Sequence, residues 1–342
     1  MVGGRDVVIA GGGIIGLSLA IELAGEGFAV TVVERNLCMR GASWAAAGML
    51  AAEDPHHPAA LISLAKLSRD LYPEYLARIE RLSQMRVPLR TRVALLGSAG
   101  TLDAATIALL APRLRHDNFS LVDEDSIDPR DLCVALPVAA RSMGVELLEG
   151  CAFQGVKPSA RHVEVATDAG ELEAVFFVDC RGVASEGGVE PRKGQMVAVE
   201  WPVERLRCVV RTPEVYLVPR GDGRVVIGAT VERGVSDTIV YAEEIERLVA
   251  LADDLLPGIA EATRLESWAG VRPGTADDVP VMGATAEKNC FVASGHFRNG
   301  ILLAPATARV MTQLICAAAG RGEAPSIALD AFSLARFHPL SR

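Results

Sequence analysis

Three glycines near the start of the chain have the spacing of a dinucleotide-binding turn. Gly11, Gly13 and Gly16 form G-x-G-x-x-G between an apolar run at residues 6–10 and a helical pattern at residues 17–24. In this motif the first glycine permits a tight turn, the second lets backbone N–H groups approach a pyrophosphate, and the third lets helix and strand pack closely. The phosphates then lie at a helix N-terminus, where unpaired N–H groups and the helix dipole attract anions.

An acidic residue completes this unit. Residues 28–34 have the pattern of a second strand, which ends on Glu34, 18 residues after Gly16. The carboxylate there can accept both hydroxyls of an adenosine ribose and would repel a 2′-phosphate, which argues against NADP. The strand, turn, helix and second strand together predict a bound dinucleotide, but they do not separate FAD from NAD.

Two further segments bear on that choice. Residues 41–49 (GASWAAAGM) are small enough for a flat ligand or its phosphates to lie against the backbone. Residues 294–307 form a second glycine-rich turn before a helix, whose N-terminus suits the N1–C2=O edge of a flavin, because that edge becomes negative on reduction. An NAD-dependent dehydrogenase has no need for this second element, so the pair favours a flavin.

Composition narrows the class of protein. At 342 residues, half of them apolar and 23% charged, the chain suggests about two domains with a large core. A net charge of −9 argues against a nucleic acid or an anionic membrane as the binding partner. Seven cysteines without a C-x-x-C pair fit reduced thiols in the cytoplasm. The apolar stretch at residues 7–25 is broken by glycines and carries Glu22, which favours a buried strand and helix over a membrane span.

The rest of the chain alternates between helical and strand patterns. Helices are expected at residues 59–84, 128–143, 242–255 and 301–319, the last with Pro305 in its first turn. Strands are expected at residues 93–96, 145–148, 162–167, 174–179, 195–199, 215–218, 224–229, 266–271 and 291–293. No internal repeat or low-complexity linker separates them, so two domains would be interleaved along the chain.

Four segments resemble one family. Residues 295–307 (GHFRNGILLAPAT) and 268–275 (WAGVRPGT) resemble the signature segments of bacterial glycine oxidases, in the D-amino-acid oxidase family of flavoproteins. Residues 45–49 (AAAGM) and 216–220 (YLVPR) match as well, and the resemblance extends over essentially the whole chain. It implies an α/β fold (α+β when both parts are counted), in which a Rossmann-like FAD-binding domain is interleaved with a mostly antiparallel β substrate-binding domain. The implied boundaries are 1–82, 128–190 and 275–342 for the first, and 83–127 and 191–274 for the second.

The resemblance also implies non-covalent FAD, since Cys316 lies too far along its helix to reach the ring. Besides the three motif glycines and Glu34, the implied FAD-binding residues are Ile14 and Ile15 at the phosphates, Arg35 beside the adenosine, Ala42, Ser43, Ala47, Gly48 and Met49 in the small-residue loop, Val156 at the adenine, and His296, Phe297, Arg298, Asn299, Gly300, Ile301 and Leu302 along the flavin edge.

The family's substrate site falls on Arg272, which would clamp an amino-acid carboxylate through both oxygens, on Tyr216, which assists it, and on Met49. The backbone carbonyl of Arg298 would receive the substrate amine. Structural alternatives are a salt bridge for Arg272, a core position for Tyr216 and a helix-start position for Arg298. No side chain is expected to act as a general base and no metal is expected; His56 and His57 beside Asp54 are interpreted as a solvated loop.

The implied reaction is oxidation of glycine, or of sarcosine or a small D-amino acid, by direct hydride transfer to flavin N5. Its products would be an oxo acid, ammonia and hydrogen peroxide from dioxygen, with iminoglycine as a possible precursor of the thiamine thiazole, and the enzyme would be a homotetramer in the cytoplasm. Alternatives are a D-amino-acid or sarcosine oxidase, a quinone-linked dehydrogenase, an NAD-dependent dehydrogenase and a catalytically idle nucleotide-binding protein. Val231 and Glu214 replace a methionine and a histidine of the family, and residues 179–182 replace a small apolar turn, which leaves the preferred amine open.

Overall fold

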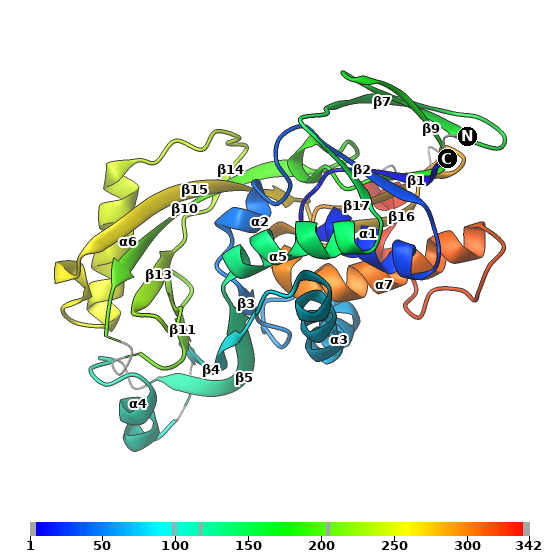
Figure 1. Ribbon diagram of the computed structural model, residues 1–342. Coiled ribbons are helices and arrows are strands. Elements are labelled where there is room, and N and C mark those ends of the chain that lie inside the picture. Colours follow the sequence, from blue (N-terminus) through cyan, green and yellow to red (C-terminus); the bar gives the residue numbers. More distant parts are fainter. Residues whose placement is uncertain (1–4, 98–99, 101, 116–117, 203–205, 338–342) are drawn as a thin grey trace.

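A computed structural model describes residues 5–97, 100, 102–115, 118–202 and 206–337; the outer ends of the predicted domain segments, at 1–4 and 338–342, lie outside it. Its strands form two large sheets (Figure 1). The main path of the first sheet is β16 (Val281–Ala284), β17 (Cys290–Ser294), β9 (Gly170–Asp179), β1 (Arg5–Ala10), β2 (Val30–Glu34) and β6 (Glu146–Glu149). All neighbours in this path are parallel except β16 and β17.

The first sheet is buried on both faces, and alternate residues of β1 show how. Val7 and Ile9 pack into a core formed with four helices, α1 (Ile14–Gly25), α3 (Leu61–Ser83), α5 (Pro129–Ser142) and α7 (Gly300–Ala318). Val8 and Ala10 face the opposite way, onto β7 (Phe153–Pro158) and β8 (Val163–Thr167), which extend from β9 over that face. This is a Rossmann-like parallel sheet, and the predicted strand–turn–helix–strand unit is confirmed.

The second sheet is mostly antiparallel, as expected, with one parallel pair between β11 and β4. Its main path is β14 (Glu232–Arg233), β10 (Glu190–Glu200), β13 (Arg224–Gly228), β12 (Tyr216–Pro219), β11 (Val209–Arg211), β4 (Leu89–Gly97), β5 (Phe119–Ile127) and β3 (Met49–Leu50), and β15 (Arg264–Gly274) pairs with β10. Helices α6 (Ala242–Leu255) and α4 (Ala104–Leu110) pack on one face, and short helix α2 (Ala42–Ala45) lies on the other.

The strands of each sheet come from several separate segments of the chain. The strands of the first sheet come from residues 5–34, 146–179 and 281–294, all within the segments assigned to the FAD-binding domain. The second sheet uses residues 89–127 and 190–274, but also β3, whose residues 49–50 were assigned to the FAD-binding domain. The chain therefore passes from one sheet to the other several times, and the exact domain boundaries stay a prediction.

The long helices lie close to where the sequence predicts them, with two differences. Helix α1 begins at Ile14, three residues before the predicted start, because the helix follows directly on the glycine turn. Pro305 lies inside α7 rather than in its first turn, which is a correction. A proline there cannot donate to the carbonyl of Ile301, and the Tyr72 hydroxyl of α3 donates to that carbonyl instead, over 2.7 Å. Tertiary packing thus replaces the hydrogen bond that proline removes.

The same two helices share a second side-chain link. The Ser68 hydroxyl of α3 donates to the carbonyl of Leu302 and accepts from the N–H of Ala306. Helix α7, with the short turn before it, is long and apolar enough to cross a membrane by length and composition alone, with a mean hydropathy of 1.5, but 72% of that window is buried inside the protein. Helix α7 is therefore a core helix, and its N-terminus is held in place by α3.

Candidate functional site

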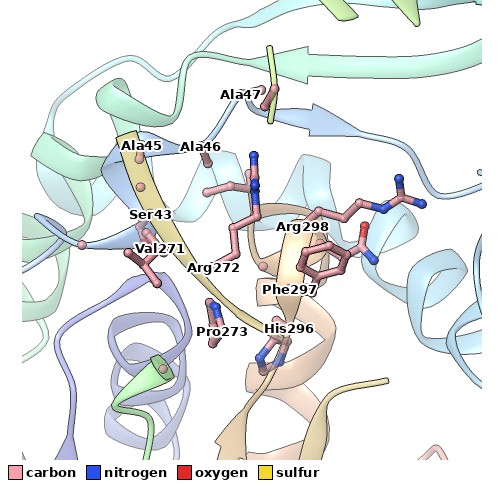
Figure 2. A pocket seen from close by; sticks show the side chains of 18 of the residues that line it. Ser43, Ala45, Ala46, Ala47, Val271, Arg272, Pro273, His296, Phe297 and Arg298 are labelled. Atoms are coloured by element: carbon pink, nitrogen blue, oxygen red, sulfur yellow. The ribbon is translucent and has the colours of Figure 1, made fainter. Parts of the chain in front are cut away.

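A cavity of about 730 Å³ lies where the two sheets meet. Its walls come from the glycine turn after β1, the segment after β2, helix α2 and its following loop, strands β12 and β15, and the turn before α7. Figure 2 shows the labelled side chains around it, with Arg272 rising from β15 and Arg298 from the segment that leads into α7. Residues far apart in the sequence are thereby brought to one place.

At one end of the cavity the glycine turn has the geometry that its motif predicts. Gly11 has a φ of +109°, and a Cβ at Gly16 would overlap the Gly11 carbonyl oxygen, so both positions need glycine for the turn and for close packing. Gly13 differs from them, since its φ is −78° and a Cβ there would meet only the Ser43 hydroxyl, at 3.5 Å. Packing within the protein does not require glycine at this cavity-lining position, whereas close approach of a phosphate does.

Two side chains fix the turn from outside it. One oxygen of Glu34 accepts from the Gly12 N–H at 2.8 Å, and the other accepts from the Asn36 N–H at 3.0 Å. The Ser43 hydroxyl accepts from the Ile14 N–H at 3.0 Å. Each carboxylate oxygen retains a second lone pair for a ribose hydroxyl, so Glu34 can hold the turn and a ligand together. The first turn of α1 carries no acidic residue, which leaves its positive end available to an anion.

At the other end of the cavity, the turn before α7 has two left-handed residues and a neutral histidine. Gly295 and Phe297 both adopt left-handed backbone conformations, with φ of 74° and 47°. His296 is fully buried beside the Thr307 hydroxyl, 3.1 Å from its Nε2, and burial lowers the pKa of His296 to about 3. The imidazole is therefore neutral at physiological pH. Helix α7 also has no acidic residue in its first turn, so its N-terminus suits an electron-rich group.

On the wall made by the second sheet, Arg272 and Tyr216 lie together. Arg272 donates to the Thr230 carbonyl at 3.2 Å, and within the described part of the chain it has no carboxylate partner. This arrangement excludes the salt bridge that the sequence left open. Burial raises the pKa of Tyr216, while the charges of Arg272 and Arg220 lower it, and the hydroxyl stays protonated at neutral pH. A guanidinium and a phenol that share one cavity wall form a site for a small anion.

The small-residue loop is held against this wall by buried contacts. The Arg220 guanidinium, 3% exposed, donates to the carbonyls of Ala47 and Ile127 at 2.7 and 2.8 Å. A Cβ at Gly270 of β15 would overlap the Ala45 side chain, so α2 can approach the sheet only because that position is glycine. Ala45, Ala46 and Ala47 consequently line the cavity.

A buried ion cluster beside the cavity was missed by the sequence reasoning. Arg211 donates to Asp54 at 2.8 Å and to Glu124 at 2.6 Å, and Arg298 lies 3.4 Å from Asp54. Asp54 is 7% exposed, so the expected solvated loop is wrong at this residue, although the neighbouring His56 is exposed. The sequence carries no signal for this cluster, because Asp54 and Arg211 are 157 positions apart.

Most of the predicted site residues line the cavity. The lining includes the following predicted residues: Gly11, Gly13, Ile14, Ile15, Glu34, Arg35, Ala42, Ser43, Ala47, Gly48, Met49, Tyr216, Arg272, His296, Phe297, Arg298, Asn299, Gly300 and Ile301. Three predicted residues do not line the cavity: Gly16, which packs on the turn, Val156, which packs against the core on the other face of the first sheet, and Leu302, whose carbonyl accepts from Ser68. Glu214 and Val231, the two departures from the family pattern, both line the cavity.

These features define a class of protein. A Rossmann-like sheet carries an open glycine turn and a suitably placed acid, and a second helix N-terminus lines the same cavity. Together these features describe a dinucleotide-binding protein with a cavity for a small molecule. The family model described as FAD dependent oxidoreductase (DAO) matches residues 6–314, so the chain belongs to the DAO family of FAD-dependent oxidoreductases. FAD is therefore its cofactor, as predicted, and the NAD-dependent alternative does not hold.

Individual relatives agree with this assignment. The chain is 36% identical to the bifunctional protein ThiO/ThiG of Synechocystis sp. over 91% of its own length, but it spans only about half (51%) of that protein. It is 30% identical to the glycine oxidase of Pseudomonas putida, with 92% of this chain and 95% of that one covered. The crystal structure of glycine oxidase from Geobacillus kaustophilus superposes with a TM-score of 0.88, at 30% identity, over 97% of this chain and 98% of that one.

Proposed function

We propose that the protein is an FAD-dependent amino-acid oxidase that oxidises glycine or a similarly small amine bearing a carboxylate. The observation that carries this proposal is Arg272, a cavity-lining guanidinium without a carboxylate partner in the described chain, next to the neutral Tyr216 hydroxyl. A planar guanidinium can donate to both oxygens of one carboxylate, and a phenol can donate to one of them. Glycine oxidases among the relatives support the choice of substrate class.

The residues around the glycine turn fit FAD. Gly13 and the N–H groups that open α1 would hold the pyrophosphate, Glu34 the ribose, and the turn at residues 296–301 the flavin edge. When bound, FAD supplies two-electron redox chemistry, accepting hydride from the substrate Cα and passing the electrons to dioxygen. Cys316 lies near the far end of α7 and is not among the cavity-lining residues, so we propose that FAD binds non-covalently.

The remaining work of the site is orientation. Arg272 and Tyr216 would hold the carboxylate, and the backbone carbonyl of Arg298 would accept from the substrate amine, so that Cα faces the flavin. His296 is neutral and hydrogen-bonded to Thr307, and it would act through position rather than as a base. With the substrate amine unprotonated, hydride transfer needs no side-chain base at Cα. This agrees with Arg272 and the protonated Tyr216, neither of which is a base.

The finer assignments follow from the family and remain proposals. Met49, Val231 and Glu214 line the cavity and would select among glycine, sarcosine and small D-amino acids. Similarity to a ThiO/ThiG protein supports a role in supplying iminoglycine for thiamine thiazole synthesis. Seven free cysteines fit a cytoplasmic location, and the family resemblance favours a homotetramer.

One panel tests the proposal. The purified holoenzyme is mixed with glycine, sarcosine, D-alanine, D-proline and methylamine, and flavin bleaching is followed without oxygen and peroxide with it. We expect bleaching by glycine and not by methylamine, which has the amine but no carboxylate. Bleaching without peroxide would instead identify a dehydrogenase that uses a quinone. Equal rates with glycine and methylamine, or no bleaching by any of the five, would refute an amino-acid oxidase.

A further inference from the structure

We propose that Gly194 is a positioning residue of the substrate site, because the absence of its side chain sets where the Arg272 guanidinium lies. This inference rests on the proposed function and names a residue that the motifs of the sequence do not include. Gly194 lies in β10, and Arg272 lies in the neighbouring antiparallel strand β15.

The register of these strands brings the two residues together. Arg192 pairs directly with Arg272, and Gly194 pairs with Gly270, so all four project from the same face of the sheet. A Cβ built on Gly194 would lie within 3.0 Å of the Nη1, Cζ and Nη2 atoms of Arg272, which real Cβ atoms essentially never do. The guanidinium therefore occupies the space of the missing side chain.

The backbone conformation does not account for glycine at this position, and the nearest contacts of a Cβ would be with Arg272. Gly194 does not have a left-handed φ, so an L side chain is compatible with its conformation. The three nearest atoms that a Cβ would meet all belong to the guanidinium of Arg272. A glycine in a strand interior otherwise weakens the strand, so its presence here is explained by the close approach of Arg272.

The guanidinium is confined from a second side as well. Its Nη1 donates to the Thr230 carbonyl at 3.2 Å. Thr230 is in turn fixed, because its hydroxyl accepts from the Gln195 N–H at 2.9 Å and donates to Glu232 at 2.8 Å. The Arg272 guanidinium thus lies between Gly194 and the Thr230 carbonyl. A methyl group at position 194 must therefore displace the guanidinium.

The neighbouring Arg192 does not compete with Arg272 for an anion in the cavity. Arg192, directly opposite Arg272, turns the other way, over Gly274, and its guanidinium binds Asp278 and the Thr275 carbonyl and stacks 4.6 Å from the Phe297 ring centre. Its charge is neutralised by Asp278, so the two like charges do not compete for one anion. The close approach to Gly194 keeps Arg272 on the cavity side, where it pairs with no carboxylate of the described residues.

The Tyr216 side chain also packs against a glycine of a neighbouring strand. Tyr216 of β12 pairs with Gly228 of β13, and a Cβ on Gly228 would lie within 3.0 Å of the Tyr216 Oη and Cζ atoms. Both proposed carboxylate ligands therefore rest on glycines of neighbouring strands. Gly194 lies outside the cavity lining, whereas Gly228 is part of it.

The test is Gly194→Ala, compared with a matched control. Gly25→Ala is the control, because a Cβ at Gly25 would also meet an arginine guanidinium, that of Arg78, at 2.7 Å, but on α1 and outside the cavity lining. We expect Gly194→Ala to raise KM for glycine and the inhibition constant of acetate about 10- to 100-fold, since a displacement of about 1 Å has effects of this order, with a smaller change in kcat. Gly25→Ala should leave both constants unchanged.

A double mutant separates positioning from a general structural effect. In the Arg272→Ala background the crowded atoms are gone, so adding Gly194→Ala should change kcat/KM less than about 2-fold. If Gly194→Ala alone does not fold, it must fold in that background. An independent loss in the double mutant, failure of the double mutant to fold, or unchanged glycine and acetate constants in Gly194→Ala would each overturn the inference. If Arg272→Ala itself leaves the glycine kinetics unaltered, the proposed function fails first, and the inference fails with it.

Discussion

Replacing Arg272 by alanine tests the proposed site most directly. Within the described part of the chain, the guanidinium donates to the Thr230 carbonyl and interacts with the Tyr216 hydroxyl, and it forms no ion pair. Its loss therefore leaves no buried carboxylate without a partner, which is the usual reason for a large loss of stability at an arginine. We expect the variant to fold, to bind FAD and to show the flavin absorption spectrum of the wild type. The effect should appear in substrate binding alone.

The size of that effect follows from the hydrogen bonds lost. A hydrogen bond to a charged group contributes about 1.5–3 kcal/mol, so a bidentate pair is worth about 3–6 kcal/mol, or about 10²–10⁴ in kcat/KM. Arg272 is only partly buried, and Tyr216 remains to bind one oxygen, which favours the lower half, about 10²–10³. Arg272→Lys retains the charge but loses the fork, so about 10- to 100-fold is expected.

The assay compares glycine with methylamine in wild type and variant. Loss of a carboxylate contact must lower kcat/KM for glycine and leave that for methylamine nearly unchanged, so the preference for glycine should collapse. An equal fall for both amines would mean that Arg272 supports the flavin or the fold rather than the carboxylate. A variant that keeps the full preference for glycine would refute the reasoning.

Three further changes have defined outcomes. Glu34→Gln replaces the charged acceptor of the Gly12 N–H, so FAD affinity should fall about 10-fold in a fluorescence titration of the apoprotein. Burial lowers the pKa of His296 from 6.5 to about 3, so its contribution to stability is complete above pH 6.5 and is lost as the pH falls. Urea unfolding should therefore show a loss of about 2 kcal/mol between pH 6.5 and about 5. This loss should be absent in His296→Gln. The effect of Glu124 on the pH dependence of stability has the opposite sign. Burial raises its pKa from 4.5 to about 7, so its contribution to stability is complete below pH 4.5 and is lost as the pH rises to about 7. In Glu124→Gln this decline in stability should vanish.

The part of the fold that could be predicted is the part set by neighbours in the sequence. The glycine turn, its flanking strands and Glu34 lie within one short stretch, and their conformations follow from local sterics and hydrogen bonding. Helices α3, α5 and α6 were found because their apolar residues recur with helical spacing. Strands β5, β7, β11 and β16 were missed, because short or irregularly alternating strands have no such signal.

The substrate wall could be located only through resemblance to a family. Nothing in residues 216–220 or 268–275 taken alone says that Tyr216 and Arg272 meet, since the contact depends on β10 and β13 lying between them. The ion cluster of Asp54, Arg211 and Glu124 had no family signature, and it was not found at all. The same limit applies to Pro305, whose position inside α7 depends on a hydroxyl from a distant helix.

The glycines of this chain show which structural roles a sequence motif can record and which it cannot. Gly11 is glycine for a local reason, a φ of +109° that few other residues adopt, and a motif records such a reason because the spacing along the chain fixes it. Neither Gly194 nor Gly228 has a left-handed φ. Side chains of neighbouring strands fill the space of a Cβ there, that of Arg272 at Gly194 and those of Tyr216 and Met196 at Gly228. No spacing along the chain encodes that requirement, because it arises only when the strands pair. Residues that position a functional group from across a sheet must therefore be read from the structure, and here they underlie both proposed ligands of the carboxylate.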